Sequence, residues 1–126
     1  MRSPLPARLL AVLATVAVAV LLLIPLPVPP EGFGPPESDK LMHALLFGVL
    51  ALLWAWTLSA RQTSRIVAVA AAVSLYGGAL ELLQALTPER SSDWRDFAAD
   101  AAGALLAALA WRLLGRVGPW QTAERD

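Results

Sequence analysis

Four long apolar runs, separated by short polar segments, make up most of this chain. The runs cover approximately residues 9–26, 41–58, 66–86 and 97–114. A helix of about 20 mostly apolar residues spans a bilayer, and a backbone in hydrocarbon must satisfy its own hydrogen bonds. The runs do not alternate in polarity with period two, as strands would. The pattern therefore predicts an all-α fold: a single membrane domain, residues 1–126, built as an integral membrane bundle of four transmembrane helices.

The first run has two interpretations. Arg2 and Arg8 precede it, as basic residues precede the apolar part of a secretory signal peptide. The segment that follows, 25–30, is rich in proline and lacks an Ala-x-Ala cleavage site. We therefore expect the first helix to be retained, and a cleaved signal peptide is the alternative.

Composition excludes several classes of protein. Of the 126 residues, 57% are hydrophobic and 16% are charged, whereas a soluble domain carries roughly a quarter charged residues. Ten basic and ten acidic residues cancel, and a neutral chain is unsuited to coating nucleic acid, so no nucleic-acid partner is expected. The absence of cysteine excludes disulfides, thiol catalysis and cysteine-based zinc sites.

The basic residues are divided unequally between the two ends of the predicted helices. Three of the ten belong to one end: Lys40, Arg90 and Arg95. The other seven belong to the opposite end: Arg2, Arg8, Arg61, Arg65, Arg112, Arg116 and Arg125. Cytoplasmic segments carry the excess of Lys and Arg. We therefore expect a multi-pass protein of the cell membrane with both termini cytoplasmic.

Three predicted helices each carry a stripe of polar or small residues at helical spacing. In chain order the stripes are Asp39, His43 and Phe47; Gly77, Glu81 and Gln84; and Asp93, Asp96, Asp100 and Gly103. Because the helices alternate in direction, all three stripes lie about one or two turns below the outer surface. Ionisable groups inside a membrane are costly, so they are functional candidates. We expect them to meet in one polar cluster open to the extracytoplasmic side.

Simpler roles exist for individual residues in these stripes. Asp39, and either Asp93 or Asp96, stand near predicted helix starts, where a carboxylate caps the backbone N–H groups. His43 alone is typical of a packing residue. Capping does not explain Glu81 or Asp100, which lie within apolar runs. A network of internal salt bridges, with the basic residues at this end neutralising the acids, is the alternative to a functional site.

Three segments, in order, resemble the signature of VanZ-like membrane proteins. Residues 38–47 resemble its D-K-x-x-H-x-x-x-F motif, residues 76–90 its E-x-x-Q…P-x-R segment, and residues 93–103 its D-x-x-D-x-x-x-N-x-x-G segment. Asp100 stands where many relatives carry Asn, which changes the charge of the site. The resemblance implies a small polytopic membrane protein with an outward-facing site and an envelope-related task. The founding member is associated with glycopeptide resistance, which is not the role inferred for this chain.

The first functional hypothesis is a non-enzymatic protein that binds an envelope lipid or a cell-wall precursor. The candidate binding residues are Asp39, Lys40, His43, Glu81, Gln84, Arg90, Asp93, Asp96 and Asp100. The cations among them suit phosphate, whereas the imidazole, amide and carboxylate groups suit sugar hydroxyls. Membrane lipids are the expected partners, and association into oligomers is compatible with the sequence.

Two further hypotheses give the same residues other roles. In an intramembrane hydrolase or transferase acting on a lipid-linked substrate, His43 is the general acid or base, oriented by Asp39 or Glu81. A divalent metal would then be the cofactor, with His43, Asp96 and Asp100 as ligands. In a small transporter, His43, Glu81 and Asp100 relay protons.

Overall fold

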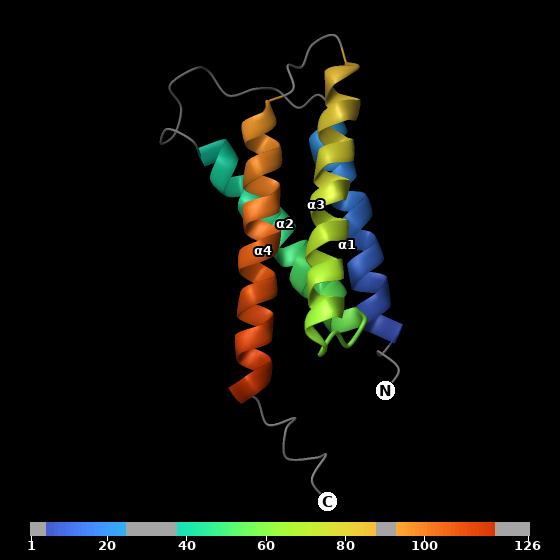
Figure 1. Ribbon diagram of the computed structural model, residues 1–126. Helices are drawn as coiled ribbons and strands as arrows, with labels where there is room; N and C mark the ends of the chain where they lie inside the picture. Colours follow the sequence, from blue (N-terminus) through green and yellow to red (C-terminus); the bar gives the residue numbers. More distant parts are fainter. Residues whose placement is uncertain (1–4, 25–37, 88–92, 118–126) are drawn as a thin grey trace, which may run out of the picture.

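The computed structural model describes residues 5–24, 38–87 and 93–117. This part of the chain consists of four helices and no strands: α1 (Leu5–Leu23), α2 (Ser38–Thr57), α3 (Thr63–Ala85) and α4 (Trp94–Val117) (Figure 1). All four are long and apolar enough to cross a membrane. The all-α class and the four predicted membrane helices are confirmed.

The helices begin a few residues earlier than the apolar runs. Ser38 opens α2, Thr63 opens α3 and Trp94 opens α4, so polar and interfacial residues form the first turns. Such residues suit the membrane interface, where helix ends still meet water and head groups. The end of the first predicted span, residues 25–26, lies outside the described residues.

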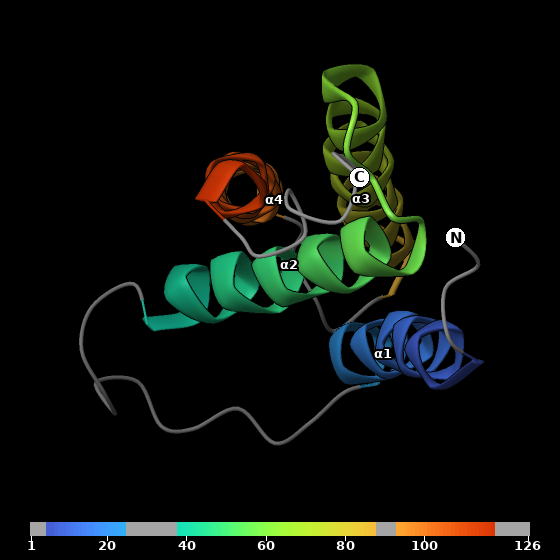
Figure 2. The same ribbon diagram turned by 90° about the horizontal axis from the view of Figure 1, so that it is seen from below.

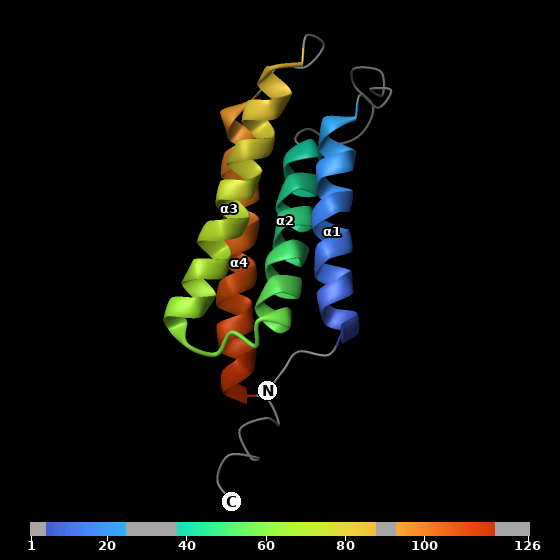
Figure 3. The same cartoon turned by 90° about the vertical axis from the view of Figure 1, so that its right-hand side faces the viewer.

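The helices run alternately up and down, and α2 crosses the bundle obliquely (Figures 1 and 2). The most extensive packing joins α2 to α4, followed by α3 to α4. Helix α1 lies on the side of α2 that faces away from α4, and it contacts α2 and α3 (Figure 3). Sequential α2 and α3 are neighbours, as their short connection predicts, but the main partner of α2 is α4.

The surface of the bundle carries many exposed apolar side chains, and its buried core is small. Leu75 and Leu82 on α3 are each 72% exposed, and leucines on the other helices are exposed in the same way. In water such a surface would aggregate, whereas lipid tails solvate it. Alanines form much of the buried core, and small side chains of this kind let membrane helices pack closely.

A Schellman-type cap ends α2 and starts the connection to α3. The N–H of Ala60 donates to the carbonyl of Ala55 at 2.9 Å, and the N–H of Ser59 donates to that of Trp56 at 3.0 Å. Ser59 takes the left-handed conformation, with φ of 48°, at the position where glycine is usual. This tight turn fixes α2 and α3 as antiparallel neighbours. The opposite end of the bundle is called the polar end below.

Candidate functional site

A buried histidine and a buried aspartate meet across the α2–α4 interface near the polar end. His43 Nδ1 and Asp100 Oδ1 are 2.8 Å apart, and Asp100 has no exposed surface. His43 lies five residues after the start of α2 and Asp100 six after the start of α4, which is about 8 Å below the helix ends. The predicted convergence of the first and third stripes is therefore present at these two residues.

Glycines allow this close approach of α2 and α4. A Cβ atom at Gly103 would overlap the backbone carbonyl of Ala44, and one at Gly48 would lie 3.3 Å from the carbonyl oxygen of Gly103. On α3, a Cβ at Gly77 would lie 2.7 Å from Asp100 Oδ2. The backbone contacts at these positions bring the polar side chains of three helices into one cluster.

Glu81 of α3 completes a group of three that we call the acid–histidine cluster: His43, Glu81 and Asp100. Each residue offers a ligand atom, and these atoms all lie within 4.8 Å of one another. Both carboxylate oxygens of Glu81 and Oδ2 of Asp100 are buried without a hydrogen-bond partner. The backbone N–H of Asp93 lies near the Glu81 carboxylate, but the two groups do not reach hydrogen-bonding geometry. The cluster therefore has unsatisfied acceptors facing one another.

Lys40 forms a second, more superficial set of contacts. Its Nζ lies 2.8 Å from Asp39 Oδ2, 3.1 Å from Asp93 Oδ2 and 2.6 Å from Asp96 Oδ1. This part of the polar end matches the salt-bridge network considered as an alternative from the sequence. Asp96 also approaches the deeper cluster, since its Oδ2 lies 3.8 Å from His43 Nε2. Lys40 is thus shared among three carboxylates and is not free to hold an anion.

Asp93 precedes α4 and caps it. The backbone N–H of Arg95 donates to Asp93 Oδ1 at 2.9 Å. This hydrogen bond, and then the Lys40 ammonium, lower the pKa of the Asp93 carboxyl below its ordinary value. The simple capping role suggested for an acid at this helix start therefore applies to Asp93.

The remaining candidates lie away from the cluster. Gln84 donates from Nε2 to the carbonyl of Leu22 at 2.6 Å, so its side chain holds α1. The Asp39 side chain is 64% exposed, outside the cluster. Arg95 is exposed, and Arg90 lies outside the described residues. Of the three metal ligands suggested from the sequence, His43 and Asp100 lie together, whereas Asp96 pairs with Lys40. Glu81 takes the place of Asp96 in the cluster.

A groove of about 500 Å³ opens beside the cluster, between α3 and α4. We call it the polar-end groove; it is lined by Leu75, Gly78, Ala79, Glu81, Leu82, Asp93, Trp94 and Phe97. Apolar side chains dominate it, and the accessible carboxylate at its polar end is that of Asp93, because the oxygens of Glu81 are buried. The sequence did not single out Trp94 or Phe97 as site residues. No signal in the sequence links Phe97 to the site; its place follows from the packing of α4 on α3, where a Cβ at Gly78 would lie 3.1 Å from the Phe97 ring.

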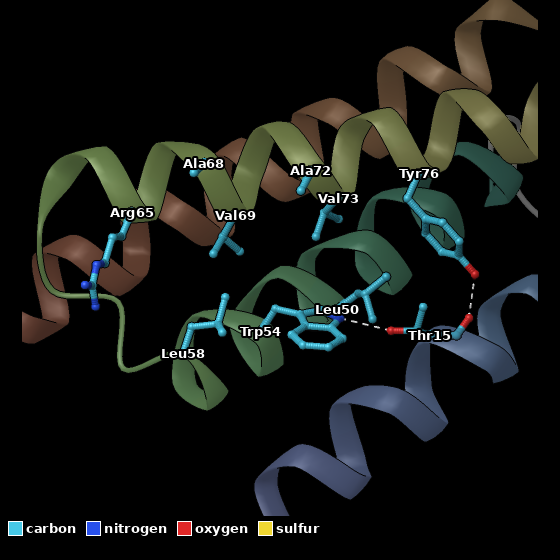
Figure 4. A pocket seen from close by; sticks show the side chains of 10 residues that line it. All are labelled: Thr15, Leu50, Trp54, Leu58, Arg65, Ala68, Val69, Ala72, Val73 and Tyr76. Atoms are coloured by element: carbon cyan, nitrogen blue, oxygen red, sulfur yellow. Dashed lines mark hydrogen bonds between the residues drawn. The ribbon is translucent and has the colours of Figure 1, made fainter. Parts of the chain in front are cut away.

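A larger groove, of about 650 Å³, lies between α2 and α3 toward the turn end. In Figure 4 its walls are aliphatic and aromatic, with Arg65 near the connection and Tyr76 at the other end. The Tyr76 hydroxyl donates to the carbonyl of Thr15 at 2.6 Å, and Trp54 Nε1 donates to the Thr15 hydroxyl at 2.9 Å (Figure 4). None of its lining residues is an acid, so this turn-end groove lacks the chemistry of the polar end.

These features define a class of protein: a small multi-pass membrane protein whose four helices bury an acid–histidine cluster near one end. The sequence profile of the family described as VanZ/LLP1 matches residues 20–115, which is most of the chain. The chain belongs to the VanZ/LLP1 family, as its three motifs predict. No curated protein and no solved structure matches it significantly.

Proposed function

We propose that this protein binds an amphiphile of the cell envelope, a lipid or a lipid-linked cell-wall precursor, at its polar end. The observation that carries the proposal is the polar-end groove, because its lining is mostly apolar and has acidic residues at one end. An acyl chain lies against Leu75, Leu82 and Phe97, and the head group lies at Asp93. A site with an apolar lining and few polar groups is typical of small-molecule binding.

The proposal includes an orientation in which this site lies outside the cytoplasm. The α2–α3 connection is flanked by Arg61 and Arg65, and the start of α1 and the end of α4 lie at the same end of the bundle as that connection (Figure 1). By the excess of basic residues, this end is cytoplasmic. The polar end therefore faces the extracytoplasmic side of the cell membrane, where envelope lipids and cell-wall precursors are used.

The charges at the polar end favour a particular head group. Lys40 is already paired with three carboxylates, and Glu81 and Asp100 add two more acids, so among the described residues the acids at this end outnumber Lys40 and the exposed Arg95. Carboxylate oxygens accept hydrogen bonds and repel anions. The head group therefore carries amino or hydroxyl donors, as an aminolipid or a glycolipid does, in preference to a bare phosphate.

Two alanines on the same face of α3 provide a matched test. Ala79 lines the polar-end groove and Ala72 lines the turn-end groove, and both are exposed. Ala79→Phe fills the first groove and Ala72→Phe fills the second. Native mass spectrometry of the purified protein with phosphatidylethanolamine, a diacyl glucosyl lipid and phosphatidic acid measures the binding of each lipid.

The proposal expects the first two lipids to bind more tightly than phosphatidic acid. Ala79→Phe lowers that binding by about 10-fold or more, equivalent to roughly 1.4 kcal/mol, and Ala72→Phe leaves it unchanged. Asp93→Asn reduces the preference over phosphatidic acid. Equal binding of all three lipids, or equal losses in the two alanine variants, overturns the proposal.

The His43–Asp100 contact favours a second candidate function, an intramembrane hydrolase or transferase. A histidine oriented by a buried carboxylate at 2.8 Å is the arrangement of a general base. Here Asp100 takes the orienting role that the sequence suggested for Asp39 or Glu81. Turnover of a lipid-linked substrate that is lost in His43→Gln, with lipid binding retained, would support this function over binding alone.

A further inference from the structure

We infer that the acid–histidine cluster is a binding site for a single divalent transition-metal ion, with His43, Glu81 and Asp100 as its protein ligands. This inference goes beyond the proposed function, because it does not depend on what the polar-end groove holds. It follows from the unsatisfied acceptors of the cluster, the absence of a described cation to neutralise them, and the donor set itself.

The first step is the unsatisfied acceptors. Glu81 is 7% exposed and Asp100 is 0% exposed, yet three of their four carboxylate oxygens have no hydrogen-bond partner. Buried polar groups are hydrogen-bonded in most proteins, and leaving them unpaired is costly. Three unpaired oxygens in one cluster, facing a histidine, indicate that a positively charged ligand completes the site.

The second step is the lack of another cation. Lys40 is the nearest basic side chain on α2, and its ammonium is held by Asp39, Asp93 and Asp96. Within residues 5–24, 38–87 and 93–117, no lysine or arginine forms an ion pair with Glu81 or Asp100. A divalent ion balances the two carboxylates and leaves His43 neutral, as a ligand requires.

The third step is the geometry. Ligand atoms bound to one ion at about 2.1 Å lie roughly 3 Å apart when adjacent and about 4 Å apart when opposite. His43 Nδ1 and Asp100 Oδ1, 2.8 Å apart, already have the adjacent spacing. The ligand atoms of the cluster all lie within 4.8 Å of one another, so a bound ion would draw them only slightly closer together.

The donor set selects the kind of ion. Imidazole nitrogen suits zinc, copper, iron or nickel, whereas calcium and magnesium prefer oxygen ligands. Asp96 Oδ2 lies 3.8 Å from the other ring nitrogen, His43 Nε2, which is longer than a hydrogen bond; a closer approach on metal binding would let this carboxylate orient the imidazole. Three protein ligands leave a coordination position open. Glu81 also lines the polar-end groove, although both of its carboxylate oxygens are buried behind the groove wall.

The test uses the full-length protein purified in detergent after treatment with chelator. Zn²⁺ binding is measured by isothermal titration and by elemental analysis, and Co²⁺ is used as a probe because its visible absorption reports the ligands and their geometry. Glu81→Gln keeps the shape of the side chain but removes its charge. Asp39→Asn removes an exposed acid from the same end of the bundle and is the matched control.

We expect a single Zn²⁺ ion per chain in the wild type and in Asp39→Asn. Loss of a side chain that only hydrogen-bonds to a metal ligand lowers metal affinity by roughly 10- to 100-fold, so loss of the ligand charge in Glu81→Gln should lower it by about 100-fold or more. His43→Gln should abolish the Co²⁺ spectrum. The inference is overturned if the wild type binds neither ion, if Glu81→Gln binds as tightly as the wild type, or if Asp39→Asn weakens binding equally.

Folding of the variants does not decide the outcome. If Glu81→Gln fails to fold, the wild-type Co²⁺ spectrum still tests the site, because a surface-bound ion lacks the absorption of a fixed imidazole ligand. Lipid binding is measured separately, so loss of metal with retained lipid binding, or the reverse, distinguishes this inference from the proposed function.

Discussion

Gly103 of α4 lies directly against the backbone carbonyl of Ala44 of α2. A Cβ at this glycine would fall 2.8 Å from the Cα of Ala44 and closer still to its carbonyl oxygen. The obstacle is backbone, which cannot move aside as the tip of a side chain can. This single contact sets how near α2 and α4 approach, and therefore whether His43 reaches Asp100.

Gly103→Ala should destabilise the bundle more than a surface substitution does. The added methyl forces α2 and α4 apart, and overpacking of this kind costs about 1–3 kcal/mol or more. Thermal unfolding in detergent, followed by circular dichroism, measures the loss.

Gly115→Ala on the same helix is the control, because a Cβ there meets nothing within 4 Å. Alanine is the better helix former by up to about 1 kcal/mol, so this variant should be as stable as the wild type or more stable. If both variants lose the same stability, the close approach of the helices is not the cause.

A second prediction concerns α1, whose retention the sequence left open. Four side chains on α2 and α3 donate hydrogen bonds to it: Trp54, Thr57, Tyr76 and Gln84. Removal of α1 would leave these donors without partners, at about 1–3 kcal/mol for each that stays buried. We therefore expect the mature protein to keep α1.

The intact mass of the protein, purified through a carboxy-terminal tag, tests this expectation. A mass that includes residues 1–24 agrees with it, and a mass that begins near residue 30 contradicts it. Gln84→Leu and Tyr76→Phe should each lower the unfolding temperature, since each removes one of these hydrogen bonds.

The helices could be predicted from the sequence because their signal is local. Apolar runs of membrane length need no partner to be recognised, and the helical spacing of Asp100 and Glu81 could be read within each helix. The pairing of α2 with α4 and the hydrogen bond from Gln84 to α1 depend on contacts between residues far apart in the chain. For the same reason Lys40, a candidate phosphate ligand from its charge alone, is held by carboxylates of α2 and of the segment that opens α4.

The Asp93 carboxylate should make stability depend on pH in the acid range. Its pKa is lowered by the N–H of Arg95 and by Lys40, and Glu81 lines the same groove. A lowered pKa means that the folded state favours the charged form. The stabilisation is therefore complete above the ordinary value of about 4 and is lost as the pH falls through the lowered value.

Asp93→Asn isolates this effect, because asparagine also caps a helix and only the charge is removed. We expect the variant to unfold at a slightly lower temperature than the wild type at pH 7 and at the same temperature in strong acid. Unfolding temperatures measured across this range provide the check. A difference that does not change with pH would show that the charge of Asp93 is not responsible.

The last prediction is the orientation of the bundle, on which the extracytoplasmic position of the site depends. The chain has no cysteine, so a single introduced cysteine reports one position without interference. Gln62 is exposed in the α2–α3 connection between Arg61 and Arg65, and Leu86, at the polar end, is 80% exposed. An excess of basic residues marks the cytoplasmic side, so a membrane-impermeant maleimide should label Leu86→Cys in intact cells. Gln62→Cys should react only after the membrane is permeabilised, and the reverse pattern would place the acid–histidine cluster on the cytoplasmic side.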